Sequence, residues 1–533
     1  MSGPVWSGFQ RVARAAPDRP CLEDAAGVVT RGELLRVAGG VARQLAGLRA
    51  AGRVVAVLLP RDRHLPAAIL AAHAAGAAYL PLDSGQPDHR LRAVLADATP
   101  VCVVTSAALR HRVPGDCPAV VHERVRPALP PPEPPGVGAD RPAYLIYTSG
   151  SSGTPKGVLV GQAALGNYFA ALDAVLARPR AQVWQPVSSI GFDSSVAELL
   201  WPLARGKYVC LTPNDPLSLL ESPLAGRSRL GARVTHVQGT PSMARLLTGD
   251  PATLAGMRAL DTLLVGGEPF PYDVLAALAG TGGAGPRVIN VYGPTEATVW
   301  VAATPVTARS PAPCSIGPPI AGAALYVLDG RLHPARTGRL FIGGASLAYG
   351  YWRRGALTAE RFCPDPFAAD GSRMYDTGDL ARVRGDGEIA VLGRVDDQVK
   401  IRGHRVELGE VESALKACPW VQDAACLHRP GPDGTGTLTA VVVPEPGGGP
   451  GGGPAGAGPA DPADAVRHWL AARLPPYMIP AEVRLRPDRL PLTLSGKLDR
   501  ARLTSWLSAG RGGGEPAVSP PGSGTSGSGN PPR

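Results

Sequence analysis

The sequence lacks several features that would assign it to other classes of protein. Aromatic residues make up only 5% of its 533 residues, and its eight cysteines form no CxxC pair or other metal-ligand spacing. No apolar run reaches the roughly 18 residues that a membrane-spanning helix needs, and the N-terminus has no apolar signal core. The net charge of +10 is spread along the chain, without a nucleic-acid-binding motif. We therefore expect a cytoplasmic protein with reduced cysteines that binds neither nucleic acid nor membrane.

The composition predicts a chain that folds over most of its length. Hydrophobic residues make up 44% of the sequence and charged residues 18%, which is enough apolar material for several buried cores. Glycine (67) and proline (57) are numerous, but they are partly concentrated in a few stretches. We expect an extended connection at Arg126–Gly138, a flexible loop at Pro444–Pro462 and a disordered tail at Gly510–Arg533.

Residues 22–125 alternate between helical and apolar strand patterns. Helices are expected at Leu34–Leu48 and Leu65–Ala75, and strands at Val54–Leu59 and Val101–Thr105. Alternation of this kind builds a layered α/β domain around a largely parallel sheet. The fold class is therefore α/β.

The chain is expected to form two folded parts and the tail. Residues 1–395 would form a large N-terminal domain with layered α/β sheets and a β-rich subdomain, the latter containing GRLFIGG and GEIAVLG. Residues 396–509 would form a small, mobile α+β domain, and residues 510–533 the tail. The small domain is expected to contain a helix at Leu408–Ala417 and strands at Ala424–His428 and Thr437–Val443.

The stretch YTSGSSGTPKGV, Tyr147–Val158, follows directly on an expected strand at Ala143–Tyr147. Three glycines, several hydroxyl side chains and one lysine can present N–H and O–H donors to phosphate oxygens. The pattern GxxxxGK[ST] is absent, so this is not a Walker A loop. A Gly/Ser/Thr-rich stretch is often a linker, but the flanking strand favours a phosphate-binding loop.

Eight motifs in a fixed order give the chain a family resemblance. From about Phe9 to Arg502 it resembles the adenylate-forming superfamily, specifically the amino-acid-activating adenylation domains of nonribosomal peptide synthetases. The motifs are AGAAYLPLD (Ala75–Asp83), the phosphate loop, GFDSS (Gly191–Ser195), NVYGPTE (Asn290–Glu296), YDTGDL (Tyr375–Leu380), GRVDDQVKIRGHRVELGEVE (Gly393–Glu412), LPPYMIP (Leu474–Pro480) and SGKLDR (Ser495–Arg500).

The resemblance implies a two-step reaction with Mg·ATP. A carboxylate attacks the α-phosphate to give an acyl-adenylate and pyrophosphate, and a phosphopantetheine thiol then displaces AMP to form a thioester. The first step brings an anion against a polyanion, so positioned cations are needed to offset the developing charge. By resemblance, Lys497 bridges the substrate carboxylate and the α-phosphate.

The resemblance also implies a nucleotide site. Tyr292 would stack on adenine, Asp379 would accept hydrogen bonds from the ribose hydroxyls, and Glu296 would help to hold Mg²⁺, which prefers oxygen ligands. Thr148, Ser149 and Lys156 would surround the pyrophosphate. The full set of expected nucleotide-binding residues is Thr148, Ser149, Gly150, Ser151, Ser152, Gly153, Thr154, Lys156, Asn290, Tyr292, Gly293, Thr295, Asp379 and Arg394.

The family alternates between its two half-reactions by rotating the C-terminal domain about a hinge. Asp396 falls at the hinge position, Arg394 precedes it, and Gly403 falls where the second conformation opens a thiol tunnel. With Lys497, these three residues complete the expected catalytic set.

The sequence departs from the family pattern at four positions. Ser152 replaces a threonine of the phosphate loop but keeps the hydroxyl. Asp376 stands where Arg or Lys is common, and Arg339 and Tyr349 replace the usual Glu and Arg. The last three changes lie outside the expected chemistry, so they put partner or domain contacts in doubt rather than activity.

The family's pocket positions predict the substrate. Asp193 and Lys497 would hold the α-ammonium and carboxylate, and the rest of the lining is uncharged, which disfavours a charged side chain. Trp300 would plug the floor, whereas Ala197 could reopen space beside it. We expect a small neutral amino acid, with glycine first, then alanine, serine or cysteine, and a medium aliphatic residue as the fallback. The lining is Asp193, Ser194, Ala197, Gln238, Leu264, Gly266, Val291, Val299, Trp300 and Lys497.

Two other functions compete with this interpretation. An aryl-acid or acyl-CoA ligase would share the nucleotide residues, but it would not need Asp193, because its substrate has no ammonium group. A degenerate scaffold would not need intact Lys497, Asp379 and Glu296. The expected enzyme is free-standing and loads a separate carrier protein in trans, and the sequence leaves open whether it needs an MbtH-like activator.

Overall fold

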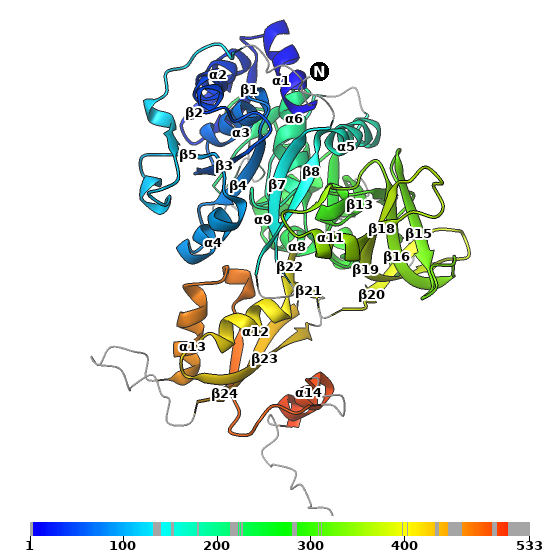
Figure 1. Cartoon of the computed structure of the whole chain (residues 1–533). Coiled ribbons are helices and arrows are strands. Elements are labelled where there is room, and N and C mark those ends of the chain that lie inside the picture. The colour runs from blue at the N-terminus through cyan, green and yellow to red at the C-terminus, as the bar shows by residue number, and fades with distance from the viewer. Residues whose placement is uncertain are drawn as a thin grey trace, which may run out of the picture.

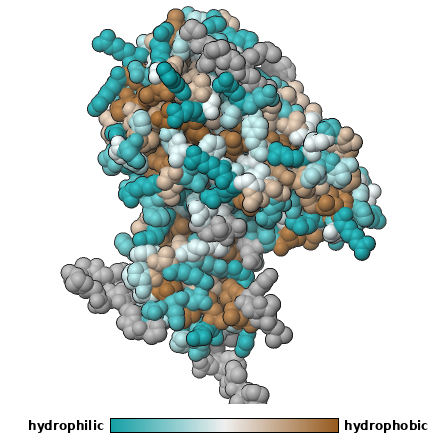
Figure 2. All heavy atoms as spheres, viewed as in Figure 1, coloured by the Kyte–Doolittle hydropathy of each residue, from teal (hydrophilic) through white to brown (hydrophobic). Residues whose placement is uncertain are grey.

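The computed structural model shows a large upper body and a smaller unit beneath it (Figure 1). Hydrophilic residues are interspersed with smaller apolar areas over the visible face (Figure 2). The structure describes residues 4–131, 140–150, 154–177, 181–213, 222, 224, 227–279, 285–307, 309–310, 312–396, 398–401, 403–431, 436–445, 461–492 and 498–509.

A seven-stranded sheet forms the first layer of the upper body. Strand β3 reads VVAVLL and is buried at all six positions, as expected for a strand covered on both faces. It pairs in parallel with β4 and β5. The strand order is β17 (Gly350–Tyr351), β8 (Lys156–Gly161), β7 (Pro142–Thr148), β4 (Ala78–Asp83), β3 (Val54–Leu59), β5 (Cys102–Thr105) and β6 (Ala119–Val121).

An eight-stranded sheet forms the second layer. Its strands β11, β12 and β13 are parallel neighbours, and the antiparallel strand β14 closes one edge. The order is β14 (Ala302–Val306), β13 (Arg287–Tyr292), β12 (Thr262–Gly266), β11 (His236–Gly239), β9 (Val183–Trp184), β10 (Tyr208–Cys210), β1 (Pro20–Asp24) and β2 (Gly27–Thr30).

Helices pack with these sheets around three apolar clusters, of which one is the largest. The largest cluster draws on helices α1, α2, α3 and α5 and on both sheets. Helix α4 packs in a second cluster, and α8, α9 and α10 pack in a third. Helix α2 begins with a capping box in which Thr30 and Glu33 exchange hydrogen bonds. The helices of the upper body are α1 (Pro4–Ala15), α2 (Arg31–Gly47), α3 (His64–Ala74), α4 (Asp88–Ala98), α5 (Gln162–Val175), α6 (Trp201–Ala204), α8 (Pro241–Gly249), α9 (Pro251–Arg258), α10 (Tyr272–Ala279) and α11 (Gly355–Arg361).

A third, antiparallel sheet and the lower unit complete the described chain. The third sheet contains β15 (Ala323–Leu328), β16 (Thr337–Gly344), β18 (Phe362–Pro364), β19 (Arg373–Val383) and β20 (Ile389–Arg394). A hairpin then joins β21 (Gln398–Ile401) to β22 (His404–Glu407). The lower unit contains α12 (Leu408–Lys416), β23 (Val421–Pro430), β24 (Gly436–Pro444), α13 (Pro462–Ala471), β25 (Glu482–Leu485) and α14 (Arg500–Ala509), and it has its own apolar core.

The predicted α/β class is confirmed. Strand Val54–Leu59 has the expected bounds, and the helix expected at Leu408–Ala417 is one residue shorter. All eight cysteines are free thiols. Among the described residues, no helix combines the length and apolarity needed to cross a bilayer. The expected tail and most of the Pro444–Pro462 loop lie outside the described residues.

Two of the departures from the family pattern, Arg339 and Asp376, form an ion pair with each other. The guanidinium of Arg339 on β16 pairs with the carboxylate of Asp376 on the neighbouring strand β19. The family's usual Glu and Arg or Lys at these positions would carry the same two charges in the reverse order. The exchange therefore preserves an ion pair, and it gives no reason to doubt a domain contact here.

This pair gives a double-mutant test. Arg339→Glu or Asp376→Arg alone would place like charges on adjacent strands and lower the stability by about 1–2 kcal/mol. The double variant should restore it to within about 0.5 kcal/mol of wild type. The measurement is the denaturant midpoint of each variant, and independent, additive losses would contradict the pairing.

Candidate functional site

The expected phosphate loop connects two antiparallel strands of the seven-stranded sheet, β7 and β8. The Thr148 hydroxyl donates to the carbonyl of Lys156 at 3.5 Å. The Ser149 hydroxyl donates to the backbone carbonyl of Arg405 at 2.7 Å, and the Gly150 N–H donates to Glu410 at 3.2 Å. The start of the loop therefore contacts the C-terminal part of the chain. Ser151, Ser152 and Gly153 lie outside the described residues, and Thr154 is exposed.

Glu296 is completely buried directly after the NVYGPT turn. Its carboxylate accepts from the Tyr351 hydroxyl at 2.7 Å and from the Arg405 guanidinium at 2.9 and 3.1 Å. Lys156 Nζ lies 3.9 Å away. Burial alone would raise the pKa of Glu296, but Arg405 and Lys156 hold that pKa at about 2. Glu296 is therefore an ionised carboxylate within a largely buried cluster of charges.

This carboxylate suits the predicted magnesium ion. Mg²⁺ is commonly held by one or two carboxylates together with substrate phosphates, so one ionised oxygen ligand beside a phosphate loop fits it. The described residues contain no group of three or more metal-ligating side chains. Lys156 is also buried. Its burial, and to a lesser extent the positive charge of the nearby Arg405, lowers its pKa to about 8.

The residues expected around adenine and ribose form a continuous network. The Tyr292 hydroxyl donates to Asp379, and Arg394 donates to the other oxygen of Asp379 at 2.8 Å. Arg394 also makes two hydrogen bonds of 2.7 Å to Asp396. Burial opposes ionisation, but the contact with Arg394 keeps the pKa of Asp396 below its ordinary value. The structure thus brings four predicted residues together at the edge of the third sheet.

Two other predicted nucleotide residues have local structural contacts. The side-chain amide of Asn290 donates to the Ser315 carbonyl at 2.8 Å. Gly293 packs against the backbone of Trp300, and a Cβ atom there would lie 2.3 Å from the Trp300 Cα. Gly293 therefore lets the chain pass close to the expected floor of the substrate pocket.

Asp193 has the environment expected of a receptor for a cation. Burial disfavours its charge, and the Thr295 side chain and the backbone at Val299 and Ser194 offset this only in part. Its Oδ2 atom is buried and has no hydrogen-bond partner among the described residues. Burial is the largest influence on its pKa, which rises to about 6. A buried carboxylate oxygen without a partner is costly unless a ligand supplies one.

The backbone beside Asp193 is strained. Thr298 and Val299 adopt φ values of 60° and 69°, in the left-handed region that β-branched residues rarely occupy. These two residues lead directly into Trp300. Strain of this kind is often found at functional sites.

The remaining predicted pocket residues come from neighbouring elements. Gln238 on β11 pairs in register with Leu264 on β12, and Gly266 pairs with Val291 on β13. The buried Trp300 ring lies edge-on to Tyr168, with 5.0 Å between the ring centres. Ala197, Leu264, Val291, Val299 and Trp300 belong to one apolar cluster, and Ser194 directly follows Asp193.

Gly403 is at the tip of the β21–β22 hairpin, with φ of 82°. A Cβ atom there would lie 2.1 Å from a methyl carbon of Thr240, so only glycine permits this contact. The hairpin therefore docks against the upper body at the predicted tunnel residue. Lys497, the predicted catalytic lysine, lies outside the described residues.

The structure adds residues that the sequence interpretation missed. Strand β22 brings Arg405 and Glu407 to the site, and helix α12 brings Glu410. The upper body contributes Tyr351 and Arg90. Arg405, Glu407 and Glu410 belong to the family motif GRVDDQVKIRGHRVELGEVE. Motif spacing could not show that they meet Glu296 and the phosphate loop.

Comparison with known families agrees with this geometry. A model described as AMP-binding enzyme matches residues 9–352, and one described as AMP-binding enzyme C-terminal domain matches residues 410–497. The chain belongs to this family and is an adenylation domain of the adenylate-forming superfamily. It is an adenylating ligase.

Curated relatives support the same assignment. The chain is 37% identical over 461 residues to a dimodular nonribosomal peptide synthase of Bacillus subtilis, covering 84% of this chain but only 18% of that protein. It is 38% identical to novobiocin biosynthesis protein H of Streptomyces niveus, with coverage of 94% and 82%. This chain thus corresponds to a small part of the multidomain relative and to most of the shorter one.

Solved structures have the same fold. An artificially fused adenylation–PCP di-domain from Klebsiella oxytoca superposes with a TM-score of 0.78 at 23% identity and covers 96% of this chain and 97% of that one. A four-domain nonribosomal peptide synthetase, AB3403, bound to AMP and glycine, has a TM-score of 0.65 at 30% identity. The superposition covers 98% of this chain and 37% of the AB3403 chain.

The raised pKa of Asp193 predicts a pH dependence. Only the ionised carboxylate can pair with an ammonium group, so kcat/KM for the amino acid should fall as pH drops below about 6, while ATP binding persists. A profile that stays flat to about pH 5 would contradict this role.

Asp193→Asn is the matching variant. Because folding raises the pKa of Asp193 from 3.8 to about 6, its ionisation costs stability as pH rises through that interval, and the full cost is present above it. Asp193→Asn should therefore abolish amino-acid-dependent activity at neutral pH without lowering the unfolding midpoint. The gain in stability should be at most about 3 kcal/mol.

Proposed function

We propose that the enzyme activates an amino acid with ATP and then loads it onto a carrier protein. In the first step a carboxylate oxygen bonds to the α-phosphorus, the bond to the β-phosphate breaks, and pyrophosphate leaves. In the second step a phosphopantetheine thiol attacks the acyl carbon, and AMP leaves as the thioester forms. The acceptor is proposed to be a separate carrier protein.

The unpartnered Oδ2 of Asp193 is the observation that carries this proposal. An amino acid brings an ammonium group that can satisfy this buried oxygen, whereas an aryl or acyl acid brings none. The fold alone does not separate the two classes, because a CoA synthetase shares it at 21% identity with a TM-score of 0.76. Asp193 favours the amino acid.

The lining supports a small neutral substrate. Apart from Asp193 and the proposed Lys497, the predicted pocket residues carry no charge, so a charged side chain would lose its hydration without gaining a partner. Trp300 is buried and braced by Tyr168, which supports its role as a fixed floor. The glycine named with AB3403 is consistent with glycine as the first candidate.

Each remaining residue has a proposed part in the chemistry. Lys497 would bridge the carboxylate and the α-phosphate, and Glu296 would hold Mg²⁺. Bound magnesium would neutralise charge on the phosphates. Tyr292 and Asp379 would orient the nucleoside, and the loop from Thr148 to Lys156 would bind the departing pyrophosphate.

The second step assigns roles to the hinge and the hairpin. Asp396 lies between β20 and β21 and is proposed as the pivot for a C-terminal domain that begins there. Gly403 is proposed to line the path of the thiol. Its tight contact with Thr240 supports this, because the hairpin tip can enter the upper body only without a side chain.

Lys497→Ala tests the first step. The lysine is expected to act at the transition state, so amino-acid-dependent ATP–pyrophosphate exchange should fall by about 10²–10³ while ATP binding is retained. Exchange within about threefold of wild type would remove this role from Lys497.

A substrate panel tests the specificity. We expect exchange with glycine first, then with alanine, serine or cysteine, assayed with and without an MbtH-like protein. Trp300→Ala should extend the range to larger neutral side chains, because it removes the floor of the pocket. A wild type that prefers basic, acidic or aromatic amino acids would refute the proposal, and so would a variant that accepts nothing larger.

A further inference from the structure

Three buried tyrosines have hydroxyl groups without a hydrogen-bond partner among the described residues. They are Tyr79 on β4, Tyr144 on β7 and Tyr168 on α5, here called the tyrosine cluster, and each is completely buried. Two further buried tyrosines, Tyr351 and Tyr375, have hydroxyl oxygens only 3.4 Å apart. A buried hydroxyl without a partner has lost its hydration and gained nothing in return. The tyrosine cluster is therefore a candidate for contact with a ligand.

The hydroxyl groups of the tyrosine cluster gather around Asp193. The rings of Tyr79 and Tyr144 have centres 5.8 Å apart, and Tyr168 packs against Trp300. Burial raises the pKa of all three hydroxyls, and the negative charge of Asp193 raises each of them further. The pKa of Tyr144 is also raised by both other members of the cluster. Because electrostatic effects weaken with distance, the three hydroxyls share the surroundings of Asp193.

The Trp300 side chain adds a fourth polar group to the same region. Its indole N–H is buried and has no partner among the described residues, and its ring belongs to the same apolar cluster as the three tyrosine rings. Ala197 in this cluster follows Asp193 by about one helical turn and offers only a methyl group, which can satisfy none of these polar groups. Three hydroxyls and one N–H thus remain available beside the proposed ammonium site.

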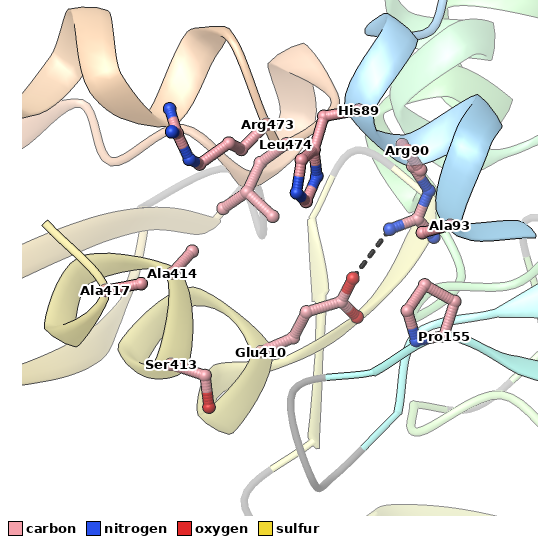
Figure 3. A pocket seen from close by; sticks show the side chains of 10 residues that line it. All are labelled: His89, Arg90, Ala93, Pro155, Glu410, Ser413, Ala414, Ala417, Arg473 and Leu474. Carbon is pink, nitrogen blue, oxygen red and sulfur yellow. Dashed lines mark hydrogen bonds and ion pairs between the residues drawn. The ribbon is translucent and has the colours of Figure 1, made fainter.

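The cavity shown in Figure 3 differs in this respect. It lies between helices α4 and α12, and its two buried charged residues, Arg90 and Glu410, form an ion pair at 2.6 Å. Buried charges that already compensate each other do not require a ligand. The polar groups around Asp193 have no such compensation among the described residues.

We propose that the tyrosine cluster and the Trp300 N–H form a polar compartment of the substrate pocket that receives the hydroxyl group of a small side chain. The proposal rests on the proposed role of Asp193 in holding the α-ammonium group. It orders the candidates that follow glycine, with serine before cysteine and cysteine before alanine. None of the three tyrosines belongs to the set of pocket positions that the sequence predicted.

A hydroxyl group matches the compartment because it can accept one hydrogen bond and donate another. The raised pKa values keep the tyrosine hydroxyls protonated at neutral pH, so each can also donate one bond and accept one. The indole N–H can only donate, and a thiol forms weaker hydrogen bonds than a hydroxyl. A methyl group leaves all four polar groups unpaired. Sites that bond a substrate hydroxyl discriminate against analogues without it for this reason.

The test compares serine with 2-aminobutyrate, in which a methyl group replaces the hydroxyl, in ATP–pyrophosphate exchange by the full chain. Wild type should have a kcat/KM for serine at least about tenfold above that for 2-aminobutyrate. Tyr144→Phe and Tyr168→Phe should each lower this ratio by about threefold or more. The kcat/KM for glycine, which has no side chain, should stay within about twofold of wild type in both variants.

Tyr326→Phe is the matched control. The Tyr326 hydroxyl donates to Asp365 at 3.1 Å in the third sheet, so its loss should leave the ratio of serine to 2-aminobutyrate unchanged. The denaturant midpoint provides a second measurement. Tyr144→Phe and Tyr168→Phe remove hydroxyls without protein partners and should not lower the midpoint. A larger loss of stability in these variants than in Tyr326→Phe would assign the hydroxyls to the fold and overturn the proposal.

Failure of this proposal and failure of the proposed function give different results. A wild type without amino-acid-dependent exchange contradicts the proposed function. A wild type that activates glycine without preferring serine to 2-aminobutyrate contradicts only the polar compartment. The same holds if Tyr144→Phe and Tyr168→Phe keep the wild-type ratio.

Discussion

The ionised carboxylate of Glu296 is the constraint on which the described site depends. It follows the last parallel strand of the eight-stranded sheet, and it is bonded by Tyr351 from the seven-stranded sheet and by Arg405 from the C-terminal hairpin. Lys156, at the end of the phosphate loop, completes the cluster. Three parts of the chain thus contact one buried negative charge, which the cations of Arg405 and Lys156 compensate.

Asp193 is a second buried carboxylate, and one of its oxygens has no partner among the described residues. There burial raises the pKa of the carboxylate, and the neighbouring Thr295 and Val299 offset this only in part. The left-handed backbone at Thr298 and Val299 adds strain to the same site. Such a site is less stable without ligand than a satisfied one, and the cost is recovered when a cation binds. Glu296 differs from Asp193, because both oxygens of its carboxylate are paired within the protein itself.

Local pattern and family resemblance were enough to predict several strands and helices and to select candidate site residues. The apolar run VVAVLL defined strand β3, and the order of the motifs led to Asp193, Tyr292, Glu296 and Asp379. What sequence could not supply were contacts set by domain docking, such as those of Arg405 with Glu296 and of Glu410 with Arg90 and Gly150. The structural bond from Asn290 to Ser315 was also missed, because a motif identifies a residue type and not the partner that its side chain finds.

The Arg339–Asp376 pair has a consequence for recombining parts of this fold. Strands β16 and β19 carry the pair in one orientation, and the family pattern carries it in the other. A chimaera that exchanges one of these strands with such a relative would set two positive or two negative charges side by side. Stepwise substitution meets the same barrier unless one position first becomes uncharged. The two strands are therefore a single unit of exchange, although more than thirty residues separate the two side chains along the chain.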